Sequence, residues 1–303
     1  MNTSQIIFGI GNPLIDIIIV ATDYDIKNMG LTKGTMKLVE LKQQKEIMGY
    51  FKDAKSKFCP GGSAPNTIIA CAGLGVPSMI SGKIGDDKFG DIYLKQIEKY
   101  GALSSLVQIN GGSTGTSVIL VTPDGERTMA THLGICRDYS SKDIDKDQLI
   151  KSSFLYFTGY MWDTASQKEA IREAITIAKE NKIKIAFDVA DPFVVKRNKI
   201  EFLDMIKNDV DIVFANQAEL AILFDSNDTL ASINELMKYI RSGGIKLGKE
   251  GSIVFENKKK YQIKPNFVKS KDSTGAGDMY AAGFLSSLSR FDDYLIAGKL
   301  GVA

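Results

Sequence analysis

Ile183-Lys184-Ile185-Ala186-Phe187-Asp188 is one of several short apolar runs that recur through the middle of the chain. The other runs, and the segments of helical spacing that separate them, lie at 154–157, 166–180, 200–207, 212–215, 217–223, 230–241 and 243–247. Strands that are apolar throughout and alternate with helices are typical of a parallel sheet covered on both faces. This stretch predicts a three-layer α/β/α domain with a mostly parallel central sheet.

The N-terminal part of the chain does not follow this alternation. Strand patterns at 14–20 and 36–41, and a pair at 116–133 around Pro123-Asp124-Gly125, come without intervening helices of the same kind. We expect them to form a small β-sheet lid from about residues 12–60 and 113–133. The rest of the single chain 1–303 would form the large α/β domain, with the ligand site in a cleft between the two.

Composition excludes several classes of function. The 303 residues contain 38 Lys and Arg against 36 Asp and Glu, so no nucleic-acid partner is expected. No apolar run approaches the length of a membrane span, and the three cysteines form no disulfide or zinc pattern. We therefore expect a cytoplasmic protein without a membrane partner. His132 is the single histidine, so acid–base chemistry is expected to rest on carboxylates.

Asp272-Ser273-Thr274-Gly275-Ala276-Gly277-Asp278 has the pattern of an anion-binding loop at the start of a helix. Free N–H groups at a helix N-terminus bind phosphate oxygens, and Asp278 in the first turn would be placed to accept a proton from an attacking hydroxyl. A capped helix with a glycine-rich entry and a favourable acidic residue fits the pattern equally well.

Two further segments carry polar groups at element boundaries. Pro60-Gly61-Gly62-Ser63-Ala64-Pro65-Asn66 opens a helix, and its paired glycines permit close backbone approach or merely a tight turn. Asn216 and Glu219 follow a predicted strand and share a helix face, where they could organise Mg²⁺ through water or act as a cap with a surface carboxylate.

Two glycine patterns lack the residues that would make them nucleotide motifs. Residues 243–250 have Glu250 where a Walker A loop needs Ser or Thr for Mg²⁺. Gly9-Ile10-Gly11 follows a strand but has Leu14 where a Rossmann fingerprint needs Gly or Ala.

Together, Gly61-Gly62-x-x-x-Asn66, Asn216-x-x-Glu219 and Asp272-x-Thr274-Gly275-Ala276-Gly277-Asp278 resemble the ordered signature of the ribokinase/PfkB family of sugar and nucleoside kinases. The resemblance covers essentially the whole chain and implies a ribokinase-like fold. Gly11-Asn12-Pro13-Leu14-Ile15-Asp16 is most similar to the adenosine kinase branch, as are Gly115-Thr116 and Glu126-Arg127-Thr128.

The resemblance implies a catalytic group and an acceptor site. Asp278 would be the general base, the amides of Gly275, Ala276 and Gly277 would form the anion hole, and Arg127 would swing from the lid toward the phosphates. The residues implied in substrate binding are Asn12, Asp16, Gly61, Gly62, Ser63 and Asn66.

It also implies ATP and Mg²⁺ as cofactors, with K⁺ as a candidate monovalent cation near Asp272. Asn216 and Glu219 would organise Mg²⁺ and its waters. The residues implied in ATP binding are Asn216, Glu219, Lys246, Gly248, Gly251, Gly275 and Gly277.

The implied activity is phosphorylation of a hydroxymethyl group of an adenosine-like nucleoside. A sugar kinase of the ribokinase or fructokinase type remains an alternative, as does a catalytically silent nucleoside- or sugar-binding protein. The expected partners are ATP and the small-molecule substrate, and the chain is expected to be a monomer or a lid-mediated homodimer.

Overall fold

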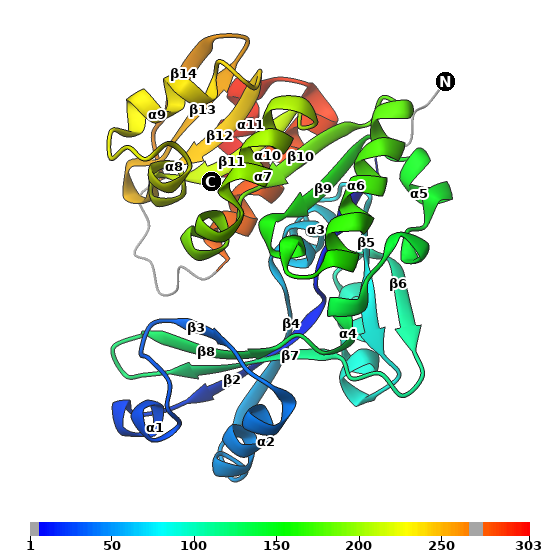
Figure 1. Cartoon of the computed structure of the whole chain (residues 1–303), viewed down its shortest axis with the longest axis vertical. Coiled ribbons are helices and arrows are strands. Elements are labelled where there is room, and N and C mark those ends of the chain that lie inside the picture. The colour runs from blue at the N-terminus through cyan, green and yellow to red at the C-terminus, as the bar shows by residue number, and fades with distance from the viewer. Residues whose placement is uncertain (1–5, 267–274) are drawn as a thin grey trace.

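The structure is a computed structural model that describes residues 6–266 and 275–303. Two sheets organise it, and in Figure 1 the smaller one projects from the larger, helix-covered one. The prediction on Asp272, Ser273 and Thr274 falls outside the described residues.

The large sheet has nine strands in the order β14-β13-β12-β11-β10-β9-β1-β5-β6. From β12 to β6 in this order, neighbouring strands pair in parallel. At the other edge, β13 pairs antiparallel with β12, and β14 pairs antiparallel with β13. The expectation of a mostly parallel central sheet is therefore confirmed. In chain order the strands are β1 (Ile7–Ile10), β5 (Ser78–Gly85), β6 (Leu103–Ile109), β9 (Phe154–Thr158), β10 (Lys184–Asp188), β11 (Ile212–Asn216), β12 (Ser242–Lys246), β13 (Ser252–Glu256) and β14 (Lys259–Ile263).

Helices cover both faces of this sheet (Figure 1). They are α3 (Ser63–Gly73), α4 (Lys88–Lys99), α5 (Lys146–Ile150), α6 (Ala165–Glu180), α7 (Pro192–Asn208), α8 (Gln217–Phe224), α9 (Thr229–Leu236), α10 (Ala276–Phe291) and α11 (Tyr294–Gly301). Short 3₁₀ turns are η1 (Gly134–Asp138), η2 (Ser141–Asp143), η3 (Gly159–Trp162) and η4 (Gly248–Glu250).

The core consists of two apolar clusters, one on each face of the large sheet. Ile185 and Phe187 of β10 belong to the cluster with α6, α7, α8 and α9, whereas Ala186 belongs to the cluster with α3, α4, α10 and α11. A strand buried on both faces needs apolar residues at successive positions, because neighbouring side chains point to opposite faces. That requirement explains the continuous apolar runs in the sequence.

The second sheet has five strands in the order β3-β8-β7-β2-β4. These are β2 (Leu14–Val20), β3 (Met36–Leu38), β4 (Ser56–Gly61), β7 (Gly115–Val121) and β8 (Arg127–His132), accompanied by α1 (Asp23–Asn28) and α2 (Leu41–Tyr50). One face buries Ile15, Ile17 and Ile19 together with Ile26 of α1 and Ile47 of α2. The early strands that did not fit the alternation thus form a separate sheet.

Several observed elements differ from the expected ones. Strands β4 and β6 were not predicted from the sequence, and β3 ends at Leu38 rather than at residue 41. Helix α7 begins at Pro192, capped by Asp191, and bends at Asn198, whose φ of −121° is not helical. Strand β4 contains the polar residues Ser56 and Lys57 and also Pro60, so its sequence does not have the apolar pattern of a strand. A strand that is only partly buried tolerates such residues.

Candidate active site

The predicted site residues gather at the carboxyl edge of the large sheet. Asp188, Asn216 and Lys246 are the last residues of the neighbouring strands β10, β11 and β12. Parallel strands end at one edge of their sheet, and ligands of open α/β sheets bind there. The N-termini of α3 and α10 meet at this edge, as contacts between Ser63 and Asp278 show.

Helix α10 begins with backbone N–H groups that no side chain of the described residues caps. Gly275 occupies its N-cap position at a φ of +76°, in the left-handed region that favours glycine. The first helical residues are Ala276 and Gly277, whose N–H groups have no carbonyl partner within the helix. Three of the predicted anion-binding residues therefore lie at a helix start suited to an anion.

The Asp278 carboxylate lies in the first turn of α10 and is held by α3. Its Oδ1 accepts a hydrogen bond from Ser63 Oγ at 2.7 Å, and its Oδ2 accepts one from Asn66 Nδ2 at 3.2 Å. Thr67 Oγ1 donates to the Asp278 carbonyl at 3.2 Å, which fixes the two helix starts together. Residues more than 200 positions apart in the chain thereby orient one carboxylate.

The environment of Asp278 makes it more basic than an ordinary aspartate. Burial is the largest effect and raises its pKa from 3.8 to about 6, partly opposed by the hydrogen bonds from Ser63 and Asn66. The Asp188 carboxylate raises this pKa further, and the Lys246 ammonium lowers it. A carboxylate with such a pKa is largely ionised at neutral pH and can still accept a proton.

Lys246 is a buried cation beside the start of α10. Its Nζ lies 2.7 Å from Asp188 Oδ2, and a Cβ placed on Gly277 would lie 3.2 Å from the same Nζ. Burial lowers the pKa of Lys246, but the nearby carboxylates of Asp188 and Glu219 outweigh it, and the pKa stays above its usual value. Lys246 therefore brings positive charge to the predicted anion hole.

Asn216 and Glu219 form a reciprocal cap at the start of α8. Asn216 Oδ1 accepts from the Glu219 N–H at 2.9 Å, and the Glu219 carboxylate accepts from the Asn216 N–H at 2.7 Å and from its Nδ2 at 2.6 Å. Burial, followed by the Asp188 charge, raises the pKa of Glu219 to about 7. The capping interpretation of the pair holds, but its carboxylate is buried rather than on the surface.

The glycine loop joins β4 to α3 beside Asn12. Gly62 has a φ of +95°, and a Cβ there would lie 2.0 Å from the Asn12 carbonyl oxygen. A Cβ on Gly61 would lie 2.3 Å from Asp16 Oδ1, so the carboxylate of Asp16 covers that glycine. Burial raises the pKa of Asp16 to about 7, with Arg127 lowering it and Asp278 raising it. Asp16, Gly61 and Gly62 are thus close together.

Some sequence-predicted residues lie away from these contacts. Gly248 is exposed in η4, and Gly251 is a turn glycine whose Cβ would meet the Ile263 carbonyl at 2.0 Å. Arg127 begins β8 on the second sheet, and its charge acts on Asp16. Asp272, the predicted neighbour of a monovalent cation, lies outside the described residues.

Asp188 is the charged residue at this edge that the sequence analysis missed. It is 3% exposed and bonds both Lys246 Nζ and the Ala190 N–H. An aspartate that ends a buried apolar strand is the signal that could have indicated it, because a buried carboxylate needs partners.

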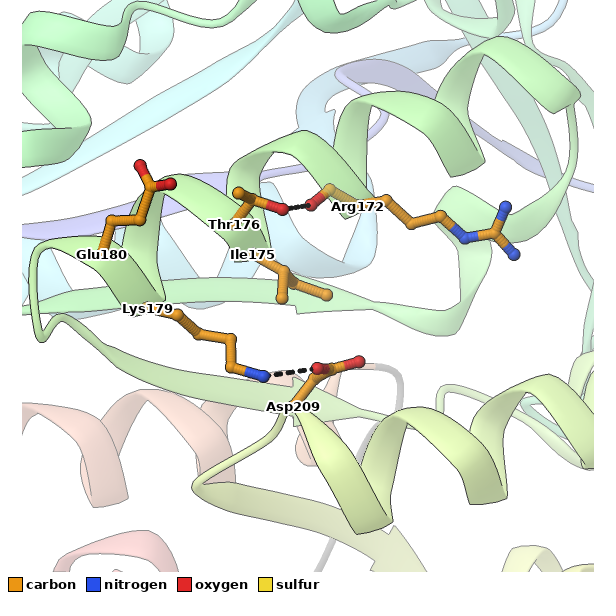
Figure 2. Close-up of a pocket in the computed structure, with 6 residues that line it drawn as sticks. All are labelled: Arg172, Ile175, Thr176, Lys179, Glu180 and Asp209. Carbon is orange, nitrogen blue, oxygen red and sulfur yellow. Dashed lines mark hydrogen bonds and ion pairs between the residues drawn. The ribbon is translucent and has the colours of Figure 1, made fainter.

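Two surface hollows lie elsewhere. One is on α2 and is lined by Leu41, Lys42, Lys45 and Glu46. The other lies along the C-terminal half of α6, where Lys179 Nζ pairs with Asp209 Oδ1 at 2.8 Å (Figure 2). Helix α6 ends just before β10 begins, so this hollow lies at the amino edge of the sheet, opposite Asp188.

Asn216 and Glu219 could hold a metal ion through its waters. No group of three or more His, Cys, Asp or Glu side chains in residues 6–266 and 275–303 is arranged to hold a metal. Each Glu219 oxygen already accepts one hydrogen bond from Asn216 and has a further lone pair for a water. This donor set suits Mg²⁺, which keeps several of its waters.

The protein has an α/β fold with two sheets, and a helix start with a glycine N-cap and the partly buried Asp278 carboxylate lies at the carboxyl edge of the larger sheet. Residues 35–303 match the family model described as pfkB family carbohydrate kinase. The chain belongs to this family, its fold is the ribokinase-like α/β fold, and it is a kinase. Family membership implies ATP and a divalent metal.

Similar proteins include both nucleoside and sugar kinases. The chain is 33% identical to a solved adenosine kinase from Sinorhizobium meliloti, with a TM-score of 0.91 and coverage of 99% of this chain and 92% of the other. It is 27% identical to adenosine kinase from Schizosaccharomyces pombe, covering 99% of this chain and 92% of that protein. It is 28% identical to 5-dehydro-2-deoxygluconokinase from Clostridium perfringens, covering 80% of this chain and 76% of that protein.

None of the helices in the described part of the chain is long and apolar enough to span a membrane.

Proposed function

We propose that this kinase transfers the γ-phosphoryl group of ATP to a hydroxymethyl group of an adenosine-like nucleoside, with Asp278 as general base. The observation that carries the proposal is the Asp278 carboxylate, held by Ser63 and Asn66 beside the open N-terminus of α10. The acceptor hydroxyl would lie between this carboxylate and the phosphoryl group.

Asp278 can take the proton without losing its supports. An ionised carboxylate has about four lone-pair sites, and Ser63 and Asn66 use two of them. A free site can accept the proton of the attacking hydroxyl as the new phosphoester bond forms and the bond to ADP breaks. The N–H groups of Gly275, Ala276 and Gly277 would bind the oxygens on which negative charge develops.

The nucleotide end would use residues at the ends of β11 and β12. Asn216 and Glu219 would hold waters of a bound Mg²⁺, which neutralises charge on the phosphates. Lys246 Nζ would add a second positive charge, and Gly248 and Gly251 would lie along the nucleotide. K⁺ near Asp272 remains part of the proposal.

The acceptor end would use Asn12, Asp16, Gly61 and Gly62, with Ser63 and Asn66 acting through Asp278 as well as on the substrate. The sheet of β2, β3, β4, β7 and β8 would act as a lid over this end, corresponding to about residues 12–60 and 113–133. Arg127 would move toward the phosphates on closure, and exclusion of water would keep it from competing as acceptor.

The choice of a nucleoside rests on the adenosine kinases among the relatives and on the Asn12–Asp16 segment. A sugar kinase is the second candidate, because 5-dehydro-2-deoxygluconokinase shows similar identity. Among the aromatic side chains that could stack on a base, Phe157 and Trp162 are buried in the core, whereas Phe193 is 63% exposed.

The cellular setting is also a proposal. The three cysteines are free, as suits a reducing compartment such as the cytoplasm. A monomer, or a homodimer paired through lid strands, would be consistent with the second sheet, and sedimentation of the purified protein would distinguish them.

The test is a coupled ADP-release screen of the purified protein with adenosine, other nucleosides, ribose and fructose. We expect turnover with adenosine or a close relative, and none in the Asp278→Asn variant. Turnover with a free sugar alone would replace the nucleoside proposal by the sugar kinase. Binding of an acceptor without turnover would indicate the silent binding protein.

A further inference from the structure

Gln167 is a buried amide in the first turn of α6 that the proposed reaction does not use. It is 0% exposed, and its Nε2 donates to Asn12 Oδ1 at 2.7 Å and to the Cys136 carbonyl at 2.9 Å. Both of these acceptors lie in segments that connect the two sheets. Asn12 lies between β1 and β2, and Cys136 lies in η1, just after β8.

The Cys136 carbonyl fixes the direction of this hydrogen-bond chain. A carbonyl oxygen can only accept, so the end of Gln167 that faces it must be the NH₂ group. That NH₂ group also faces Asn12, so Asn12 must present its Oδ1 to Gln167. The Nδ2 of Asn12 is then directed to its other side, where its one partner among the described residues is the Tyr160 carbonyl at 3.5 Å.

The arrangement leaves the Asn12 amide with a donor to offer. A contact of 3.5 Å is at the long limit of hydrogen bonding, so Nδ2 can bond a better acceptor. The Asn12 backbone carbonyl lies against Gly62, directly before Ser63 that bonds Asp278, so Asn12 lies near the proposed acceptor end of the site.

The amide of Gln167 is only partly satisfied by hydrogen bonds. Its Oε1 is buried and accepts no hydrogen bond from the described residues. A buried acceptor without a partner destabilises a fold, and this cost is set against the two hydrogen bonds that Nε2 donates to Asn12 and Cys136. What the amide adds is a fixed orientation of Asn12.

We propose that Gln167 is a positioning residue that holds Asn12 with its NH₂ group toward the acceptor substrate, so that the site selects for a hydrogen-bond acceptor atom there. This inference rests on the proposed function, because Asn12 is placed at the acceptor end only by that proposal.

The sharpest variant is Gln167→Glu, which keeps the shape and removes at least one of the two donors. A fully buried Glu favours its neutral form, which has a single O–H donor. The Cys136 carbonyl can only accept and takes this donor, so Asn12 would turn its NH₂ group to Glu and present Oδ1 to the substrate. We expect the KM for the acceptor to rise at least about tenfold, with kcat and the KM for ATP within about threefold of wild type.

A double-mutant cycle tests whether the effect passes through Asn12. In an Asn12→Ala background, Gln167→Glu should leave the acceptor KM unchanged, because the group it orients is gone. Ser166→Ala is the matched control, since Ser166 Oγ bonds the neighbouring Arg137 carbonyl at 3.2 Å and does not contact Asn12. This control should keep the wild-type KM.

A second readout does not depend on activity. The side-chain NH₂ signals of Asn12 in ¹⁵N spectra, assigned by their loss in Asn12→Asp, should shift in Gln167→Glu and stay in place in Ser166→Ala. Unchanged Asn12 signals in Gln167→Glu, or additive KM effects in the cycle, would overturn the inference. An inactive wild-type protein whose Asn12 signals respond as expected would contradict the proposed function and leave the orientation by Gln167 supported.

Discussion

At the scale of single residues, the pKa and the orientation of Asp278 depend on the side chains around it. The same carboxylate on an exposed helix start would be an ordinary favourable first-turn residue. Here burial raises its pKa to about 6, and Ser63 and Asn66 fix its direction. The sequence identified the residue, whereas its basicity follows from side chains that the fold brings to it.

Replacement of Asp278 by Asn should separate activity from stability. We expect turnover to fall at least about a hundredfold, as for loss of a general base. Because the folded pKa of Asp278 lies above 3.8, ionisation lowers stability progressively from about pH 4 to about pH 6, and the full cost remains above that. Thermal unfolding of the variant at pH 7.5 should therefore occur at the wild-type temperature or above it. Near-normal turnover would remove Asp278 from the role of base.

The pH dependence should report the same carboxylate. With Asp278 required in its ionised form, kcat/KM should fall about tenfold per pH unit below about pH 6. The pKa values of Asp16 and Glu219 are both about 7, so Asp16→Asn is the control, and this variant should keep the limb near pH 6 and lose only the contribution of Asp16 near pH 7. A profile flat down to pH 5 in the wild type would show that Asp278 does not limit the reaction.

At the scale of elements, much of the proposed site lies at the first residues of helices. Helices α3, α8 and α10 begin at the carboxyl edge, and they use two different devices at the N-cap position. Asn216 caps α8 with its side chain, whereas glycines at positive φ begin α3 and α10. A side-chain cap satisfies N–H groups, and a glycine leaves them free, which explains why α10 rather than α8 is suited to the phosphoryl group.

The two ends of α3 should respond in opposite ways to the same substitution. Gly62→Ala places a Cβ at 2.0 Å from the Asn12 carbonyl at a φ of +95°, and we expect a loss of about 2 kcal/mol or more in the free energy of unfolding. Gly73→Ala meets nothing within 4 Å and should stabilise the helix by about 0.5 kcal/mol. Urea unfolding measures both. Equal effects would show that the close approach at Gly62 does not constrain the fold.

At the scale of the whole molecule, the residues of the proposed site come from both sheets and from α10. Asp16 and Arg127 lie on the smaller sheet, Asn216 and Lys246 end strands of the larger one, and Asp278 lies in the first turn of α10. Joint binding of a substrate by both sheets would require them to approach, with the connections near Asn12 and Cys136 as the bending points.

Spin labels should detect this closure. One pair of labels, at Val20→Cys and Lys249→Cys in a Cys59→Ser background, places one label on the smaller sheet and one on the large domain. Both positions are exposed. We expect the distance between labels to shorten when the acceptor and a non-hydrolysable ATP analogue are added together. A pair at Glu180→Cys and Lys249→Cys, both on the large domain, should stay unchanged. A constant distance in the first pair would exclude a lid role for the smaller sheet.

The sequence predicted the class of fold because that class has a direct chemical signature. Strands buried on both faces are apolar at most positions, so β9, β10 and β11 were recognisable from their composition. Strands β4 and β6 are partly exposed, follow no such rule and were missed. The contribution of Gln167 was also missed, because a lone glutamine in a helix gives no signal in the sequence.

What the sequence by itself determined is local. The alternating pattern, the glycines at helix starts and the Asn216–Glu219 cap depend on backbone and side-chain chemistry within a few residues. What only the tertiary structure decided is the meeting of Ser63 and Asn66 with Asp278, of Asp188 with Lys246, and of Gln167 with Asn12. The physical reason is that pKa values and amide orientations are set by neighbours in space, and parallel strand order brings together residues that lie far apart in the chain.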